Sequence, residues 1–264
     1  MRYYIDSDNG LGSHFGDVDD AFAIAALLRS GLDVMALGSV SGNTTEPRAS
    51  ANNRRLAELC RFHGLLVRPP EGGISRLLAA EEGQMTIAAL GPLTNIAAAL
   101  QEDQTLASRV REVVMVGANI SSRGRWPPLW PHEFNLTKDK AATFAVFNSA
   151  LPLTFVPLDV ARRLRATRSR LRAIQHSLIG SHLGEGSQRW MRRSRILKWS
   201  SSFPVWDLTA AMYLIEPALY VFEDTFAEMA SSTHVRFGTG SRPVRLVRFI
   251  DEAEVWEAFT RLIG

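Results

Sequence analysis

Carboxylate side chains crowd the first part of the chain, where residues 6–20 read DSDNGLGSHFGDVDD. Like charges placed so close together repel one another unless a cation neutralises them, and hard divalent cations prefer oxygen ligands. The chain has one cysteine and six histidines, so Ca²⁺ or Mg²⁺ fits this stretch better than Zn²⁺. Helix N-capping could explain Asp19 and Asp20, but not Asp6 and Asp8 on the preceding apolar run. The stretch therefore predicts a divalent-metal site.

The elements that must position these carboxylates alternate between short apolar runs and segments with helical periodicity. This pattern is typical of an α/β fold with an open, mostly parallel, Rossmann-like sheet. The expected strands cover residues 2–6, 33–39, 65–67, 85–90, 110–116 and 153–156, and the expected helices cover 19–31, 46–63, 92–101 and 138–147. Residues 118–134 are expected to form a loop. The 264 residues show no linker, so a single domain spanning 1–264 is expected.

The alternation stops after Asp159. Helical stretches are expected at about 161–176, 186–199 and 206–215, and those within about 161–200 are expected to form a helical cap over the sheet. The chain then predicts a C-terminal β-hairpin, with residues 234–237 pairing with 244–249 around a Gly-Thr-Gly turn, and a last helix from Glu252.

Polar residues follow several of the expected strands at the point where each strand ends. In an open α/β sheet, ligands bind beyond the carboxyl ends of the strands. The polar groups at those ends are Asp6 and Asp8, Gly42-Asn43, Leu90 to Asn95, Gly117 to Asn119, and Leu158-Asp159. Their convergence predicts a ligand site at this edge of the sheet.

Together these residues resemble the nucleoside hydrolases, a family of calcium-dependent N-ribohydrolases. The family's Asp-x-Asp-Pro-Gly-x-Asp-Asp-Ala motif corresponds to residues 6–10 and, after an insertion, to residues 18–21. Its further motifs follow in order as Gly42-Asn43, Gly91-Pro-Leu-Thr-Asn-Ile-Ala97, Glu133-Phe-Asn135 with Asp139, Pro157-Leu-Asp159 and Asp207. The resemblance runs from residue 2 to about 217, and it implies the family's Rossmann-like fold and the hydrolysis of a ribonucleoside to ribose and free base.

The resemblance also implies a role for each matching residue. One Ca²⁺ ion would be held by Asp8, Asp20, Asp207 and the backbone carbonyl of Leu90, and the ribose diol would complete its oxygen shell. Asp8 would in addition take a proton from the water that attacks C1′. The ribose would be held by Asp19, Asn43, Glu133 and Asn135. Asp6 would support the site from behind.

Trp206 bears on which base leaves. One branch of the family has a histidine before the late aspartate, whereas a branch that prefers purine nucleosides has tryptophan there. The resemblance therefore implies that Trp206 stacks on a purine and assists its departure, which would suit a purine-salvage enzyme. A core aromatic at a helix start is the alternative interpretation of Trp206. Trp126 and Trp130 could supply an opposing ring or serve as hydrophobic plugs.

Three departures from the family pattern concern the substrate. Residues 11–17 are inserted within the metal motif, and must bulge outward so that Asp8 and Asp20 still converge. His14 and Phe15 would then lie at the pocket rim. The segment between residues 65 and 85 is short and retains only a Pro-Pro-Glu-Gly-Gly stretch at 69–73. Arg123, Arg125 and His132, in the loop before Glu133, could meet a phosphate or remain solvated.

The partners expected from composition are few. Between residues 162 and 198 stand ten arginines and one lysine against a single acid, Glu185. This stretch is either a solvated helix surface or a patch for an anionic partner. It lacks regularly interleaved aromatic residues, so no nucleic-acid partner is expected. No signal peptide or run of 18 apolar residues is visible, so we expect a cytoplasmic protein without a membrane partner, and a homo-oligomer, either a dimer or a tetramer.

Three rival functions remain open from the sequence. A strand followed by Asp-x-Asp also begins the haloacid-dehalogenase phosphatases, but no matching later lysine is evident. A divergent homologue could bind a nucleoside or ribose without hydrolysing it. An N-glycosidase could act on a phosphorylated or modified nucleoside.

Overall fold

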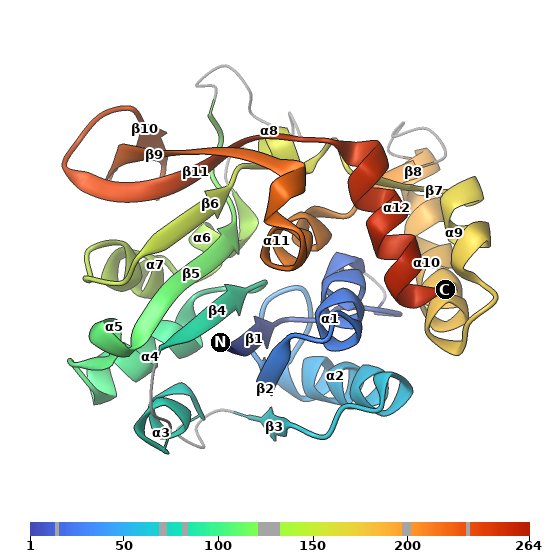
Figure 1. Cartoon of the computed structure of the whole chain (residues 1–264), viewed down its shortest axis with the longest axis horizontal. Helices are drawn as coiled ribbons and strands as arrows, with labels where there is room; N and C mark the ends of the chain where they lie inside the picture. Colours follow the sequence, from blue (N-terminus) through green and yellow to red (C-terminus); the bar gives the residue numbers. More distant parts are fainter. Residues whose placement is uncertain (14–15, 69–72, 81–83, 121–132, 197–201, 231–232) are drawn as a thin grey trace.

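The computed structural model describes residues 1–13, 16–68, 73–80, 84–120, 133–196, 202–230 and 233–264 (Figure 1). In these residues a nine-stranded sheet has the order β10-β9-β11-β6-β5-β4-β1-β2-β3. Its parallel part contains β1 (Arg2–Ser7), β2 (Asp33–Ser39), β3 (Leu65–Val67), β4 (Met85–Ala89), β5 (Val110–Val116) and β6 (Leu153–Val156). The predicted α/β fold with an open, mostly parallel sheet is confirmed, and four of these strands, β2, β3, β5 and β6, have the predicted bounds.

Helices cover both faces of the sheet because successive strand residues point to opposite sides. Ile5 and Ala88 belong to a core shared with α1 (Asp19–Arg29), α11 (Trp206–Ile215) and α12 (Glu252–Ile263). Their neighbours Tyr4 and Ile87 belong to the core shared with α3 (Gly73–Ala80), α4 (Thr94–Glu102) and α7 (Lys140–Phe147). The shorter helices α5 (Leu106–Arg109) and α6 (Phe134–Lys138) lie before β5 and α7.

The helix α2 (Glu46–Cys60) ends earlier than its sequence predicts. Arg61 adopts a left-handed backbone with φ of 54°, and its N–H donates to the carbonyls of Ala57 and Glu58. The sequence predicts a helix that continues to residue 63, but the left-handed Arg61 closes the last turn before that point.

The predicted cap region is only partly helical. The expected helix at 161–176 is divided into α8 (Leu158–Ala161), the short strand β7 (Arg165–Thr167) and α9 (Arg168–Ile174). Strand β7 pairs antiparallel with β8 (Ser202–Pro204), which follows α10 (Leu178–Ile196) along the chain. Helix α10 begins eight residues before the predicted 186. It packs against α1, α2 and β8.

The C-terminal strands form the predicted antiparallel unit, but with different partners. Strand β9 (Tyr220–Met229), which was not predicted, pairs antiparallel with both β10 (Val235–Phe237) and β11 (Arg242–Ile250). The two strands expected to form a hairpin with each other therefore lie on either side of β9. Glu223 and Asp224 interrupt the apolar pattern of β9, and these exposed carboxylates pair with Arg248 and Arg245.

Strand β11 also pairs in parallel with β6, so the antiparallel unit extends the main sheet. Among the described residues, no helix combines the length and the apolar character that crossing a bilayer requires.

Candidate active site

The site lies where three neighbouring strands end together. Strand β1 is central, with β2 and β4 hydrogen-bonded on its two sides, and Asp6 stands level with Gly38 of β2 and Ala89 of β4. The chain segments that follow these strands therefore emerge side by side. The sheet register brings the Asp6 to Asp8 segment next to Asn43 and Leu90, as the sequence predicted.

Two glycines allow these segments to touch. A Cβ atom added to Gly42 would overlap the carboxylate of Asp8. A Cβ atom on Gly91 would lie 2.7 Å from Val40 Cγ1 and 3.1 Å from the backbone nitrogen of Asp8. Both glycines thus leave room for the strand that carries Asp8, which explains their place in the motifs.

Asp8 is fully buried and is in contact with Asn43. The backbone N–H of Asn43 donates to Asp8 Oδ2 at 2.5 Å, and the Asn43 amide lies 3.4 Å from both Asp8 Oδ1 and Asp20 Oδ2. Burial raises the pKa of Asp8 to about 7, against the lowering effect of the Asn43 N–H. Asn43 therefore joins the carboxylates of β1 and α1.

Three carboxylates converge from the starts of two helices. Asp19 and Asp20 begin α1, Asp207 is the second residue of α11, and one oxygen of each lies within 4.8 Å of the others. The Asp207 N–H donates to Asp19 Oδ2 at 3.0 Å, and Ser7 Oγ donates to Asp20 Oδ1 at 2.6 Å. The tightest group thus contains Asp19, which the sequence had assigned to ribose rather than to the metal.

The electrostatics of this group fit a cation. All three side chains are at most 3% exposed. Burial raises their pKa values, and the neighbouring carboxylates raise those of Asp20 and Asp207 further. Buried like charges are unfavourable unless they are protonated or paired with a cation. An all-oxygen group of this kind suits Ca²⁺ or Mg²⁺.

The other predicted ligands are connected by hydrogen bonds among themselves. The amide of Asn135 donates to the carbonyl oxygen of Leu90 at 2.9 Å, which joins two predicted site residues. The carboxylate of Glu133 caps α6 by accepting from the backbone N–H groups of Asn135 and Leu136. Burial nevertheless raises the pKa of Glu133 to about 8. Gly117, directly after β5, lies beside this side chain: a Cβ atom there would meet Glu133 at 3.4 Å, an ordinary contact.

Trp206 is the first residue of α11, directly before Asp207. It is partly buried and packs against the main core cluster, while its carbonyl accepts from Thr209 Oγ1. It thus makes core contacts, as the alternative interpretation expected, and also adjoins the carboxylate group.

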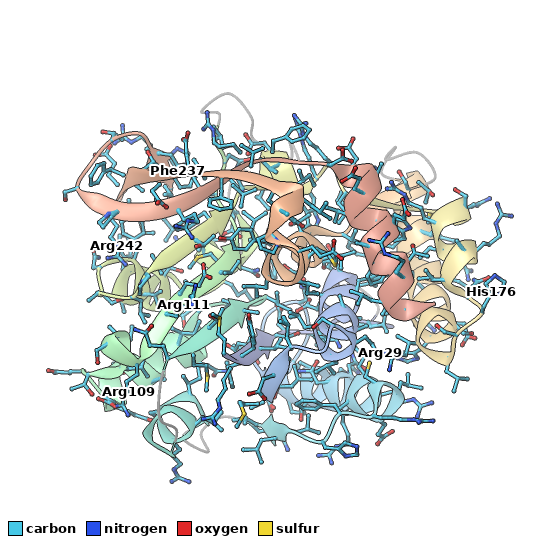
Figure 2. The ribbon with its side chains drawn as sticks, in the orientation of Figure 1. Arg29, Arg109, Arg111, His176, Phe237 and Arg242 are labelled. Atoms are coloured by element: carbon cyan, nitrogen blue, oxygen red, sulfur yellow. The ribbon has the colours of Figure 1, made fainter. Side chains whose placement is uncertain are left out.

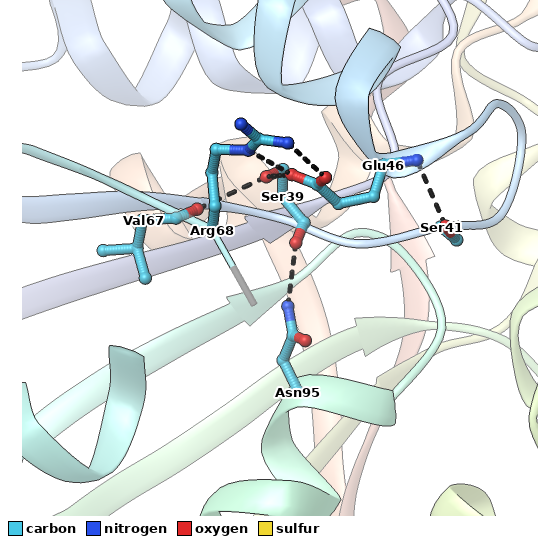
Figure 3. Close-up of polar contacts among 6 residues, drawn as sticks. All are labelled: Ser39, Ser41, Glu46, Val67, Arg68 and Asn95. Atoms are coloured by element: carbon cyan, nitrogen blue, oxygen red, sulfur yellow. Dashed lines mark hydrogen bonds and ion pairs between the residues drawn. The ribbon is translucent and has the colours of Figure 1, made fainter. Parts of the chain in front are cut away.

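A polar network behind the site was missed by sequence reasoning. The Asn95 amide donates to Asp6 Oδ1 at 2.9 Å and to the carbonyl of Ser39 at 3.0 Å. Ser39 Oγ donates to Glu46, whose carboxylate pairs with Arg68 through two hydrogen bonds (Figure 3). Burial raises the pKa of Asp6 to about 6. Asn95 stands within the Gly91 to Ala97 motif, and this position is the feature of the sequence that could have indicated its role in the network.

Several predicted residues lie outside the described part of the chain. They are His14, Phe15, residues 69–72, Arg123, Arg125, Trp126, Trp130 and His132. Among the histidines outside the motifs, His176 is exposed on the outer side of α9 and α10 (Figure 2). His63 and His234 are exposed as well, whereas His182 is partly buried.

Chemically, the site residues offer buried carboxylates together with amide and carbonyl oxygens. Such groups can hold a cation and a polyhydroxyl ligand, take a proton from water and stabilise positive charge that develops during a reaction.

Comparisons with known proteins agree on one family. The profile described as inosine-uridine preferring nucleoside hydrolase matches residues 67–257. Uridine nucleosidase 1 of Arabidopsis thaliana is 27% identical over 83% of this chain and 73% of its own length. The non-specific ribonucleoside hydrolase RihC of Escherichia coli is 26% identical over 90% of this chain and 87% of its own.

Solved structures share the fold. A plant nucleoside hydrolase covers 100% of this chain and 99% of its own, with a TM-score of 0.84 and 21% identity. The purine-preferring ribonucleoside hydrolase of Gardnerella vaginalis gives a TM-score of 0.83 at 15% identity, over 100% of this chain and 98% of its own.

Proposed function

Because the chain belongs to the inosine-uridine preferring nucleoside hydrolase family and acts on the N-glycosyl bonds of ribonucleosides, we propose that it hydrolyses a purine ribonucleoside with the help of one Ca²⁺ ion. The observation that carries this proposal is the convergence of Asp19, Asp20 and Asp207, all buried, at the ends of the strands. Asp8 lies beside them, joined to Asp20 through Asn43.

The residues that would hold the ion are Asp8, Asp20, Asp207 and the carbonyl of Leu90. The atoms that would bind the ion are all oxygens. Because the carboxylates are buried close to one another, a cation is their natural counter-charge. When bound, Ca²⁺ would draw the ribose hydroxyls and a water into one oxygen shell and polarise that water. Asp19 adjoins the same group, so it could bind the ion or the ribose.

The proton would go to Asp8. The ionised carboxylate of Asp8 would accept the proton that the attacking water loses as the water oxygen bonds to C1′. The bond from C1′ to the base nitrogen breaks with its electron pair going to the base. Positive charge develops on the sugar in such transition states. Glu133, Asn135 and Asn43 would orient the ribose and place oxygen atoms near that charge.

Trp206 supports the purine preference. It adjoins Asp207 at the start of α11, and the Trp-Asp pair resembles the purine-preferring branch. Its ring would stack on the leaving base, and solvent would protonate that base.

The experiment is a ribose-release assay on inosine, guanosine, adenosine, uridine and cytidine with Ca²⁺ present and with chelator. We expect release that requires Ca²⁺, is faster from purines and is abolished by Asp8→Asn. Faster release from uridine would reject the purine preference alone. No release from any nucleoside would reject the proposed activity.

We further propose that residues 1–264 form one domain and that the protein is a homo-oligomer, a dimer or a tetramer. Strands β9 and β11 expose Val221, Phe222, Phe226 and Phe249, between 40% and 59% each. Apolar side chains exposed on neighbouring strands favour a protein partner. Light scattering coupled to size-exclusion chromatography measures the mass, and a monomer at micromolar concentration would reject the oligomer.

A further inference from the structure

The described residues at the two ends of the inserted segment, 10–13 and 16–17, lie against each other. A Cβ atom on Gly10 would lie 2.5 Å from the Asp17 carbonyl oxygen and 3.0 Å from Gly16 Cα. A Cβ atom on Gly16 would lie 3.0 Å from the Asn43 carbonyl oxygen. Only glycine permits such a close crossing. The crossing explains how seven extra residues leave Asp8 and Asp20 joined through Asn43.

The start of the inserted segment is fixed to α2. The Asn52 amide donates to the carbonyls of Asn9 and Leu11 at 2.9 and 3.0 Å. The Asn9 side chain accepts from the Leu11 N–H and donates to Asn53 Oδ1, both at 3.1 Å. Asn9 and Asn53 are fully buried. The conformation that leads from Asp8 into the inserted segment is therefore set by hydrogen bonds, and Leu11 is held at a fixed place.

Leu11 points inward and meets the cap. It is only 7% exposed and belongs to the main core cluster together with Leu183 and Trp190 of α10. A Cβ atom on Gly186 of the same helix would lie 2.6 Å from both Leu11 Cδ1 and Leu11 Cγ. The leucine therefore fills a position that opens because residue 186 has no side chain.

This contact connects the two parts of the chain that supply the carboxylates of the site. Residues 8–20 supply Asp8, Asp19 and Asp20, whereas α10 leads through β8 into α11, which carries Trp206 and Asp207. The Asp207 N–H donates to Asp19 Oδ2, which is a second contact between these two parts of the chain. A shift of α10 relative to Leu11 would thus move the two sets of carboxylates relative to one another.

We propose that Leu11 and Gly186 are positioning residues, a knob and its socket, which hold the cap helix α10 against the metal motif and so set the spacing between Asp207 and the Asp8 to Asp20 segment. The first residue of the insertion, Leu11, then acts as a brace built into the motif. As far as it concerns catalysis, this inference rests on the proposed function.

The test is a double-mutant cycle on the full-length protein with Leu11→Ala, Gly186→Ala and the pair. Gly184→Ala is the matched control, because it makes the same change in the same helix and its Cβ would meet only the flexible side chain of Gln175. The readouts are the Ca²⁺ dissociation constant from calorimetry, and kcat and KM for the best nucleoside, at a temperature where every variant is folded.

We expect Gly186→Ala to weaken Ca²⁺ binding and to lower kcat by about tenfold or more, since small displacements of catalytic groups have large effects. Leu11→Ala added to it removes the clash and should recover most of the loss. Gly184→Ala should stay within about twofold of the parent, because it leaves the reacting groups in place. If Gly186→Ala yields no folded protein, recovery of folded, Ca²⁺-binding protein in the pair supports the proposal equally.

The proposal fails if Gly186→Ala behaves like Gly184→Ala, or if the pair is no better than Gly186→Ala alone. These outcomes leave the proposed function standing when the parent protein releases ribose. Conversely, a parent without hydrolase activity rejects the proposed function, while the Ca²⁺ affinities still decide whether the knob and socket set the metal site.

Discussion

The acidic end of the sheet and the arginine-rich cap are both runs of like charge, but only the first is buried. Asp6, Asp8, Asp19, Asp20 and Asp207 are between 0 and 3% exposed. In contrast, most cap arginines face solvent, including Arg162, Arg163, Arg168, Arg172, Arg189 and Arg192. A charge in water costs little, whereas a buried one must be paired or neutralised. Burial of the charges, and not their number, therefore distinguishes a candidate site from a solvated surface.

The largest effect should come from removing one buried carboxylate. Asp8→Asn keeps the shape of the side chain but removes the proton acceptor. We expect kcat for ribose release to fall by about 10²- to 10⁴-fold, the range of general-base catalysis. Arg172→Ala in the cap is the control and should change kcat by less than about twofold, because an exposed side chain makes few contacts. If the two variants changed kcat equally, burial of the charges would not distinguish a functional site from a solvated surface.

Binding of the metal ion at the acidic end should depend on pH. Burial raises the pKa of Asp8 to about 7 in the metal-free protein, so Ca²⁺ must displace a proton below that pH. We expect Ca²⁺ affinity to fall as pH drops from 8 to 6, and calorimetry in buffers of different ionisation enthalpy to detect proton release.

The raised pKa has a second consequence for the metal-free protein. The folded state holds its proton more tightly than the unfolded state, so this group's contribution to stability is lost as pH rises from about 4 through about 7. Chemical denaturation with chelator across that range measures the trend, and the trend should weaken in Asp8→Asn. A metal-free protein whose stability rises over this range would contradict the prediction.

A smaller effect should follow from breaking the network behind the acidic end. Asn95→Ala leaves Asp6 and the Ser39 carbonyl without their shared donor. Loss of a buried hydrogen-bond partner costs about 1–3 kcal/mol in the free energy of unfolding, measurable by urea titration. The control is Asn148→Ala, whose exposed amide bonds only to the Phe144 carbonyl on the surface. It should cost at most about 0.5 kcal/mol.

The smallest effect should be that of salt on the cap. Exposed charges are largely screened beyond a Debye length of about 8 Å at physiological ionic strength. For an uncharged nucleoside we expect KM to change by less than about twofold as NaCl rises from about 50 to about 300 mM. A steep rise in KM would instead favour a phosphate-bearing substrate or an acidic partner on the arginines, and would make the cap a functional surface.

The sequence by itself determined the parallel core and the motif residues at its edge. Strands such as Val110–Val116 are apolar runs of the right length, and their ends carry residues that local chemistry already marks, such as Asp8 and Asn43. Parallel strands must place their carboxyl ends at one edge, so a one-dimensional pattern is sufficient to predict that these residues meet.

Only the tertiary structure decided the features that depend on distant partners. Strand β9 is stabilised by β10 and β11 on its two sides. Its charged residues interrupt the apolar pattern from which a strand is predicted. Asn95, Asn52 and Gly186 matter through contacts with residues 41 to 175 positions away. Such contacts leave no periodic pattern in the local sequence, because packing and hydrogen bonding between distant parts of the chain determine the partner.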